Sequence, residues 1–185
     1  LGLLSGYARG LVDEAIMTVV DVMLAFPFLL LAMVIVFLLG PSLRNVVIAL
    51  GVSGWVTYTR VVRADVLSLR EREFVVAARS IGCNEFRIIT RHIFPQVVTP
   101  LIVVATLQVA GFIVVEAALS FLGLGIQPPT PTWGNMLAEG REYMLDAWWY
   151  ATFPGLAIMI TVLGFNTGGD WLRDILDPRS HLRNV

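Results

Sequence analysis

Lysine is absent from this chain of 185 residues, and all thirteen basic residues are arginine. A P-loop needs a lysine that reaches the nucleotide phosphates, so this chain cannot bind a nucleotide in that way. A single cysteine, Cys83, excludes a disulfide within the chain. Together with two histidines it supplies too little for a zinc site or a Cys–His catalytic pair. The sequence therefore predicts a chain that catalyses nothing and holds no cofactor or metal of its own.

Charge is also scarce. Charged residues make up 15% of the chain and apolar residues 57%, with a mean hydropathy of +0.77. Soluble domains carry about a quarter charged residues, so the excess apolar surface here needs a solvent other than water. Lipid is the expected solvent. The predicted fold class is all-α, a polytopic transmembrane helical bundle.

Four segments are long enough to cross a hydrocarbon core, which takes about 20 helical residues. Pro27 is a potential kink in the first of them, and Gly40-Pro41 ends that segment with turn chemistry. A stretch rich in proline and glycine after the third segment excludes a continuous helix there. The predicted spans cover about 15–39, 45–66, 96–119 and 148–170, with connecting loops at 67–94 and 120–147.

The arginines predict the orientation of these spans. Under this topology, eleven of the thirteen fall on one side, and only Arg44 and Arg141 fall on the other. Short loops rich in arginine stay in the cytoplasm. We therefore expect the loop 67–94 and the C-terminal tail to be cytoplasmic, and the loop 120–147 to face outward.

The cytoplasmic loop has an internal pattern of its own. Phe74, Ala77, Ala78 and Ile81 recur at helical spacing and give one apolar stripe. After that stripe, Gly82 suits a left-handed helix end, and Asn84 suits the N-cap of a second helix. Two interpretations of this helix–turn–helix elbow stay open. It is either an amphipathic linker on the lipid surface or a knob that seats in a groove of a soluble partner.

The elbow resembles a known motif. Val76-Ala77-Ala78 is followed by Gly82 and, thirteen residues later, by Pro95. This is similar to the EAA loop of binding-protein-dependent ABC importer permeases, in which Glu-Ala-Ala precedes a glycine and then Ile-x-Leu-Pro. Two parts depart from this pattern: Val76 replaces the Glu, and His92-Ile93-Phe94-Pro95 replaces Ile-x-Leu-Pro.

Blocks elsewhere resemble the peptide and nickel branch of type I importers, in particular the second permease of dipeptide and oligopeptide systems. They are Phe74-Val-Val-Ala-Ala-Arg, Arg91-His-Ile-Phe-Pro, Glu116-Ala-Ala-Leu-Ser-Phe-Leu-Gly-Leu-Gly, Gln127-Pro-Pro-Thr-Pro-Thr-Trp-Gly-Asn-Met and Asp170-x-Leu-Arg-Asp-x-Leu-Asp-Pro-Arg.

The resemblance implies an importer permease domain without its N-terminal part, in a bacterial inner membrane. It implies a second permease subunit as heterodimer partner, two ATP-binding subunits that carry ATP and Mg, and a periplasmic or lipid-anchored binding protein; nucleic acid is not expected as a partner. The elbow would then form a coupling helix docked on an ATP-binding subunit. The residues expected to couple to the ATPase are Ala77, Ala78, Arg79, Gly82, Cys83, Asn84, Glu85, Arg87 and Pro95.

Four polar residues lie within the predicted spans: Asp21, Gln108, Glu116 and Asn166. An acid deep in the membrane costs a few kcal/mol, so Asp21 and Glu116 should face protein or water. For Glu116 two interpretations stay open, a place on the translocation path or its outer gate, and an interhelical hydrogen bond that fixes packing. Gln108 and Asn166 either line a pore or hold helices together.

Two other function classes compete with the importer. A secondary transporter or channel driven by an ion gradient would need paired broken helices and carboxylates at mid-membrane, for which Glu116 is thin support. A membrane hydrolase would need a nucleophile and a base, and no histidine lies within a predicted span. The identity of the substrate is not readable from these residues.

Overall fold

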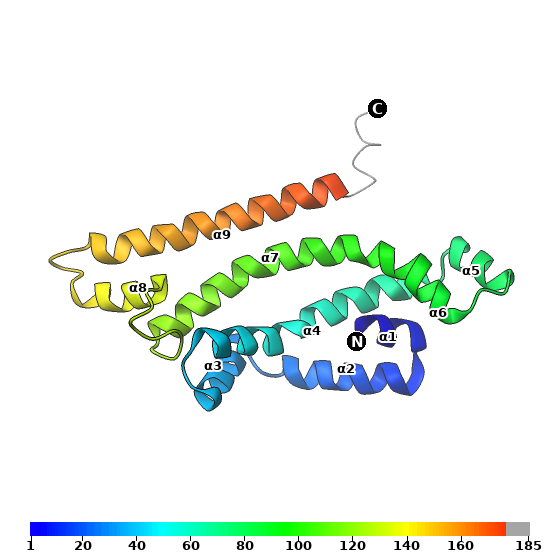
Figure 1. Ribbon diagram of the computed structural model, residues 1–185, viewed down its shortest axis with the longest axis horizontal. Coiled ribbons are helices and arrows are strands. Elements are labelled where there is room, and N and C mark those ends of the chain that lie inside the picture. The colour runs from blue at the N-terminus through cyan, green and yellow to red at the C-terminus, as the bar shows by residue number, and fades with distance from the viewer. Residues whose placement is uncertain (177–185) are drawn as a thin grey trace. The chain divides into compact units, whose positions relative to one another are not determined.

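The protein consists of helices joined by turns and loops in its structure, a computed structural model that describes residues 1–176 (Figure 1). Over those residues there is no β-strand, which confirms the all-α class. The helices in chain order are α1 (Gly2–Ala8), α2 (Gly10–Leu24), α3 (Phe28–Leu39), α4 (Leu43–Leu69), α5 (Glu73–Ser80), α6 (Glu85–Ile88), the π-helical turn η1 (Ile89–Ile93), α7 (Phe94–Phe121), α8 (Trp133–Glu142) and α9 (Trp149–Leu176).

The segment predicted as one span over 15–39 is two helices. α2 ends at Leu24, and α3 begins at Phe28. Between them Pro27 takes φ −55° and ψ 130°, an extended conformation. A proline has no N–H to donate to the preceding turn, and it pushes the residue before it away from helical angles. In the structure the potential kink at Pro27 is a complete break between the two helices.

Three long helices are apolar enough to cross a membrane by length and composition. They are α4, the run from α6 to α7 (Glu85–Phe121), and α9; the broken pair α2 and α3 would make a fourth span. The predicted segments 45–66 and 96–119 lie inside α4 and α7. α9 has 28 residues, so at 1.5 Å per residue it is about 42 Å long, more than a hydrocarbon core requires.

Contacts divide the chain into two compact units. The first comprises residues 1–25, 55–105 and 173–176. Within it, α1 lies tightly on α4, because a Cβ on Gly2 would come within 2.6 Å of the Thr59 carbonyl oxygen. The buried core of this unit joins α4, the elbow helices and the start of α7 through Val62, Val66, Val75, Ala78, Ile88, Ile93 and Val97.

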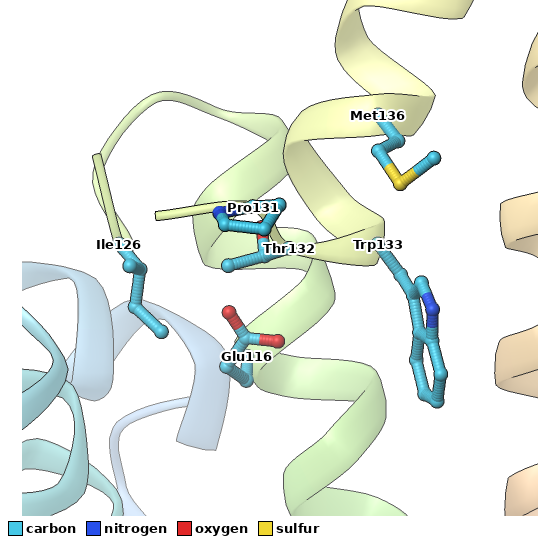
Figure 2. A pocket seen from close by; sticks show the side chains of 6 residues that line it. All are labelled: Glu116, Ile126, Pro131, Thr132, Trp133 and Met136. Atoms are coloured by element: carbon cyan, nitrogen blue, oxygen red, sulfur yellow. The ribbon is translucent and has the colours of Figure 1, made fainter. Parts of the chain in front are cut away.

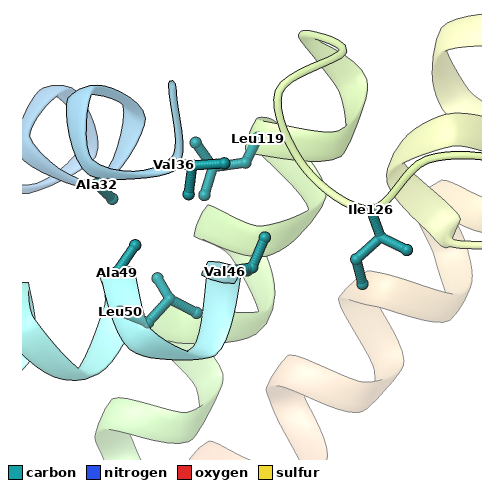
Figure 3. Close-up of a cluster of buried hydrophobic side chains, with 7 residues drawn as sticks. All are labelled: Ala32, Val36, Val46, Ala49, Leu50, Leu119 and Ile126. Atoms are coloured by element: carbon teal, nitrogen blue, oxygen red, sulfur yellow. The ribbon is translucent and has the colours of Figure 1, made fainter. Parts of the chain in front are cut away.

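The second unit comprises residues 26–54 and 106–172. Phe28 of α3 stacks on Phe112 of α7 with ring centroids 5.9 Å apart, and Gly54 leaves room for the Phe112 ring. The buried cluster of this unit is drawn in Figure 3, and it consists of Ala32, Val36, Val46, Ala49, Leu50, Leu119 and Ile126.

Many large apolar side chains remain exposed on the helices. Phe37 and Leu38 of α3 are 74% and 76% exposed, and Phe153 and Ile160 of α9 are 65% and 64% exposed. Such apolar faces are costly in water, whereas a helix satisfies its own backbone hydrogen bonds and is stable in lipid. These exposed faces belong to a multi-pass membrane protein.

Candidate functional site

Two local features of the sequence form the elbow between α5 and α6, a glycine at the end of the first helix and a capping residue at the start of the second. At the end of α5, Gly82 adopts φ +80°, the Cys83 N–H donates to the Ala78 carbonyl at 3.1 Å, and the Gly82 N–H donates to the Arg79 carbonyl at 3.0 Å. This pair of bonds is a Schellman motif, which needs a left-handed residue at the position of Gly82. Glycine takes that conformation without strain, so the sequence places the turn at Gly82.

The second elbow helix begins with a capping bond and ends in a π-helical turn. The Asn84 Oδ1 accepts from the Phe86 N–H at 3.1 Å. The predicted N-cap at Asn84 is confirmed. Beyond α6, the Phe94 N–H donates to the Ile89 carbonyl, five residues back. Pro95 follows directly and has no N–H for the usual bond, so the wider turn occupies the place where the α-helical pattern is interrupted.

The elbow buries one face and exposes another. Val75 and Ile88 are fully buried, and Ala78 is 5% exposed. Of the stripe predicted at Phe74, Ala77, Ala78 and Ile81, only Ala78 is buried. The core below the elbow is therefore reached by Val75, a position outside that stripe.

The exposed face of the elbow carries large apolar side chains. Ile81 is 81% exposed, Phe86 is 74% exposed and Phe74 is 41% exposed. Ile81 and Phe86 lie within residues 79–87, which were predicted to form the coupling knob, but none of the three was named individually as a coupling residue. The sequence does contain an indication of these residues. They are bulky and apolar, yet they lie in a loop otherwise rich in arginine and glutamate, where exposure of such side chains to water is unfavourable.

Charged groups tie the elbow to α1. The Arg79 Nε lies 3.3 Å from the Glu85 Oε1, and the second Arg79 nitrogen donates to the Tyr7 hydroxyl at 3.1 Å. Arg70 donates to the Tyr7 carbonyl at 2.8 Å, and its guanidinium lies 5.8 Å from the centre of the Tyr7 ring. These contacts fix the base of the elbow, while its tip stays uncovered.

The structure brings most of the predicted coupling residues together. Residues 77–87 share the elbow, with Arg87 exposed on α6. Pro95 lies apart from the tip, in the first turn of α7 beyond η1. The part of the structure that describes residues 1–176 contains no cluster of three His, Cys, Asp or Glu side chains suited to a metal ion.

Acidic and basic side chains of α2 and α4 form two pairs. The Arg63 Nε and terminal nitrogen donate to the two carboxylate oxygens of Asp13 at 2.6 and 2.7 Å, and the Ser5 hydroxyl also donates to Asp13. Asp21 meets Arg60 only at 3.7 Å, with both side chains more than half exposed. Asp21 was predicted from the sequence and Asp13 was not, although an arginine within a span indicates a nearby acid.

The remaining polar residues of the spans are distributed over α7 and α9. The Glu116 Oε1 accepts from the Ser120 hydroxyl at 2.7 Å, one turn along the same helix. That bond is not the interhelical one considered from the sequence. The side chains of Gln108 on α7 and Asn166 on α9 are half-buried. Asp177, Arg179, His181 and Arg183, part of the tail expected in the cytoplasm, lie outside the described residues.

Glu116 also lines a pocket of about 370 Å³ at the end of α7 (Figure 2). The other lining residues come from the following loop and the first turn of α8. They are Ile126, Pro131, Thr132, Trp133 and Met136.

Comparison with known proteins gives the family. The chain is 49% identical over 179 residues to the dipeptide transport system permease protein DppC of Alkalihalophilus pseudofirmus, which covers 97% of this chain and 59% of that protein. It is 47% identical over 179 residues to the di/tripeptide transport system permease protein DppC of Pseudomonas aeruginosa, with the same coverage. It is 45% identical to the glutathione transport system permease protein GsiD of Pectobacterium atrosepticum, over 97% of this chain and 60% of that protein.

The chain thus spans about three-fifths of the length of these relatives. Residues 1–181 match the family described as binding-protein-dependent transport system inner membrane component. The chain therefore belongs to the family of binding-protein-dependent transport system inner membrane components.

Proposed function

We propose that the chain is a permease subunit of an ATP-driven importer of short peptides in a bacterial inner membrane. It catalyses nothing itself and binds no cofactor; ATP and Mg bind to two partner subunits. A second permease completes the translocation path, and a binding protein delivers the solute. The peptide substrate is supported by the printed names of relatives that match nearly all of this chain.

The exposed apolar tip of the elbow carries this proposal. Ile81 and Phe86 project from an arginine-rich loop in which the buried face is already filled by Val75, Ala78 and Ile88. Apolar side chains on a rigid protein knob are suited to a groove on a soluble partner. An ATP-binding subunit bound to this tip would transmit the movement of its closure to α4 and α7, the helices that flank the elbow.

Gly82→Asp in the full-length permease tests the coupling role. A Cβ at Gly82 would have no heavy atom within 4 Å, so the cost to folding is the left-handed backbone, about 1 kcal/mol. The new carboxylate adds charge at the tip. We expect normal insertion and ATP hydrolysis that no longer supports peptide uptake in proteoliposomes.

Gly10→Asp is the matched control. Gly10 also has a positive φ, +61°, and open space around it, but it is the first residue of α2, outside the elbow. The control should carry the same backbone cost and keep its uptake. Normal uptake by the Gly82→Asp complex would refute the coupling role of the elbow.

The energy source of uptake distinguishes the proposed importer from a transporter driven by an ion gradient. An importer of the proposed kind keeps its uptake when an ionophore removes all gradients, and loses it when ATP is withdrawn. Uptake that stops with the ionophore and continues without ATP would favour the gradient-driven class instead.

A further inference from the structure

The pocket at Glu116 contains one ionisable group among apolar walls. Figure 2 shows the Glu116 carboxylate turned toward Pro131 and Thr132, with the Trp133 ring beside it. Ile126 and Met136 complete the lining. A volume of about 370 Å³ lies within the range of pockets that hold small ligands.

The walls of this pocket are held in place by hydrogen bonds. The loop after α7 folds back through bonds from the N–H groups of Leu124 and Gly125 to the Leu119 carbonyl, each 2.9 Å long. The Ile126 N–H donates to the Ser120 hydroxyl at 3.2 Å, and the Asn135 side chain donates to the Ile126 carbonyl at 2.7 Å. The pocket is therefore formed before any ligand arrives, which lowers the cost of binding.

α8 approaches α7 closely beside the pocket. Gly134 is buried, and a Cβ there would collide with the Ala117 carbonyl and the Ser120 side chain. Only a glycine allows this approach, which brings the neighbouring Thr132 and Trp133 to the carboxylate of Glu116. The position of the aromatic wall thus follows directly from the sequence at 132–134.

Glu116 retains capacity to accept hydrogen bonds. Its Oε1 accepts from Ser120, and among residues 1–176 no arginine or histidine pairs with its carboxylate. An ionised carboxylate accepts up to about four hydrogen bonds. The Thr132 hydroxyl accepts from the Asn135 N–H at 3.1 Å and keeps its O–H as a donor. Glu116 is the one acidic side chain of the lining, so its carboxylate is the main acceptor that the pocket offers a cation.

The lining favours an organic cation over a metal ion. Mg²⁺ and Ca²⁺ require about six or more oxygen ligands, and this pocket supplies one carboxylate. An ammonium group attached to an apolar body fits better, because its N–H groups donate to the carboxylate and its body contacts Ile126, Pro131 and Met136. The Trp133 ring can add a cation–π attraction.

We propose that this pocket binds the α-ammonium end of an incoming peptide, with Glu116 as its hydrogen-bond acceptor. The proposal rests on the proposed function, in which the solute is a short peptide, and on the outward-facing loop 120–147 expected from the sequence. Under this proposal the permease itself recognises the free amino terminus of the peptide, in addition to any selection by the binding protein.

The test uses the complete transporter with full-length permeases, held in its ATP-bound state with vanadate and without binding protein. Calorimetry compares trialanine with N-acetyl-trialanine. We expect trialanine to bind about tenfold more tightly, the effect of one charge-assisted hydrogen bond in a partly dry site. Glu116→Gln keeps the size and the acceptor for Ser120 but removes the charge, and should abolish that preference. Glu116→Asp keeps the charge and should retain part of it.

Two outcomes would overturn this assignment: equal binding of the two peptides by the unmodified complex, or a tenfold preference that survives in Glu116→Gln. The first concerns the unmodified complex, so it holds even if a variant assembles poorly. Failure here leaves the proposed function intact, because uptake and its sensitivity to Gly82→Asp are measured separately.

Discussion

The two ion pairs between α2 and α4 allow a matched test of how geometry sets their strength. Both pairs join the same two helices, and both join an aspartate to an arginine. Asp13 and Arg63 share two hydrogen bonds of 2.6 and 2.7 Å, with side chains 16% and 29% exposed. Asp21 and Arg60 approach only to 3.7 Å, with side chains 64% and 55% exposed. The first pair should therefore be much the stronger.

The coupling free energy of each pair follows from the burial of its side chains and the number of its hydrogen bonds. Hydrogen bonds between charged groups contribute about 1.5–3 kcal/mol each when water is excluded, so two bonds in a partly exposed site should couple by about 2 kcal/mol or more. An exposed pair without hydrogen bonds couples by about 0.5 kcal/mol or less. Removing Asp13 alone also leaves the Arg63 charge unpaired, which adds to the loss.

Double-mutant cycles measure these couplings directly. The first cycle uses Asp13→Asn, Arg63→Gln and the double variant, and the second uses Asp21→Asn, Arg60→Gln and their double variant. The full-length permease is unfolded by SDS titration in mixed micelles to give free energies of unfolding. Equal coupling energies in the two cycles, or a larger one for Asp21 and Arg60, would refute this reasoning.

Three further predictions concern the elbow and α1, each measured by the same unfolding titration. Ile88→Ala should lower the free energy of unfolding by about 2–4 kcal/mol, because Ile88 is fully buried. Phe86→Ala should change the free energy of unfolding by less than about 0.5 kcal/mol and instead reduce peptide uptake. Equal stability losses in the two variants would contradict the assignment of a buried and an exposed face. Asn84→Ala should cost about 1 kcal/mol through the lost cap, and no loss would show that the cap is replaceable. Gly6→Ala should cost about 1–3 kcal/mol, because its Cβ would lie 2.8 Å from the Val66 Cβ; an unchanged stability would mean that α1 moves freely away from α4.

The features that the sequence predicts well are those set by neighbouring residues. The turn at Gly82 and the cap at Asn84 need only a few adjacent residues, and both are found in the structure. The long helices follow from apolar length alone. Pro27 was recognised as a kink, but a complete break depends on how α3 packs through Ala32 and Val36 in its own unit.

Features that depend on distant contacts were not predictable from one sequence. The burial of Val75 in place of Phe74 and Ile81 is decided by Val62, Val66 and other residues far along the chain. Helical periodicity gives an apolar stripe but not the direction in which the core lies.

Polar contacts show the same dependence on distance along the chain. The pairing of Asp13 with Arg63 joins residues fifty positions apart. The pocket at Glu116 requires the approach of α8 to α7 at Gly134. The cytoplasmic location of the elbow stays a prediction from the distribution of arginine.

Cross-linking from the tip of the elbow tests the central claim most directly. Ile81→Cys is introduced into the full-length permease, because Ile81 is 81% exposed. Cys83, which is half-buried, and any other native cysteines are replaced by serine so that the reagent reports on position 81 alone. The account predicts that a membrane-impermeant thiol reagent labels this cysteine in inside-out vesicles that lack the ATP-binding subunits, but not in right-side-out ones. It also predicts that a bifunctional thiol reagent links it to an ATP-binding subunit. Labelling from the outer side only, or no cross-link to that subunit in an active complex, would contradict the role of the elbow.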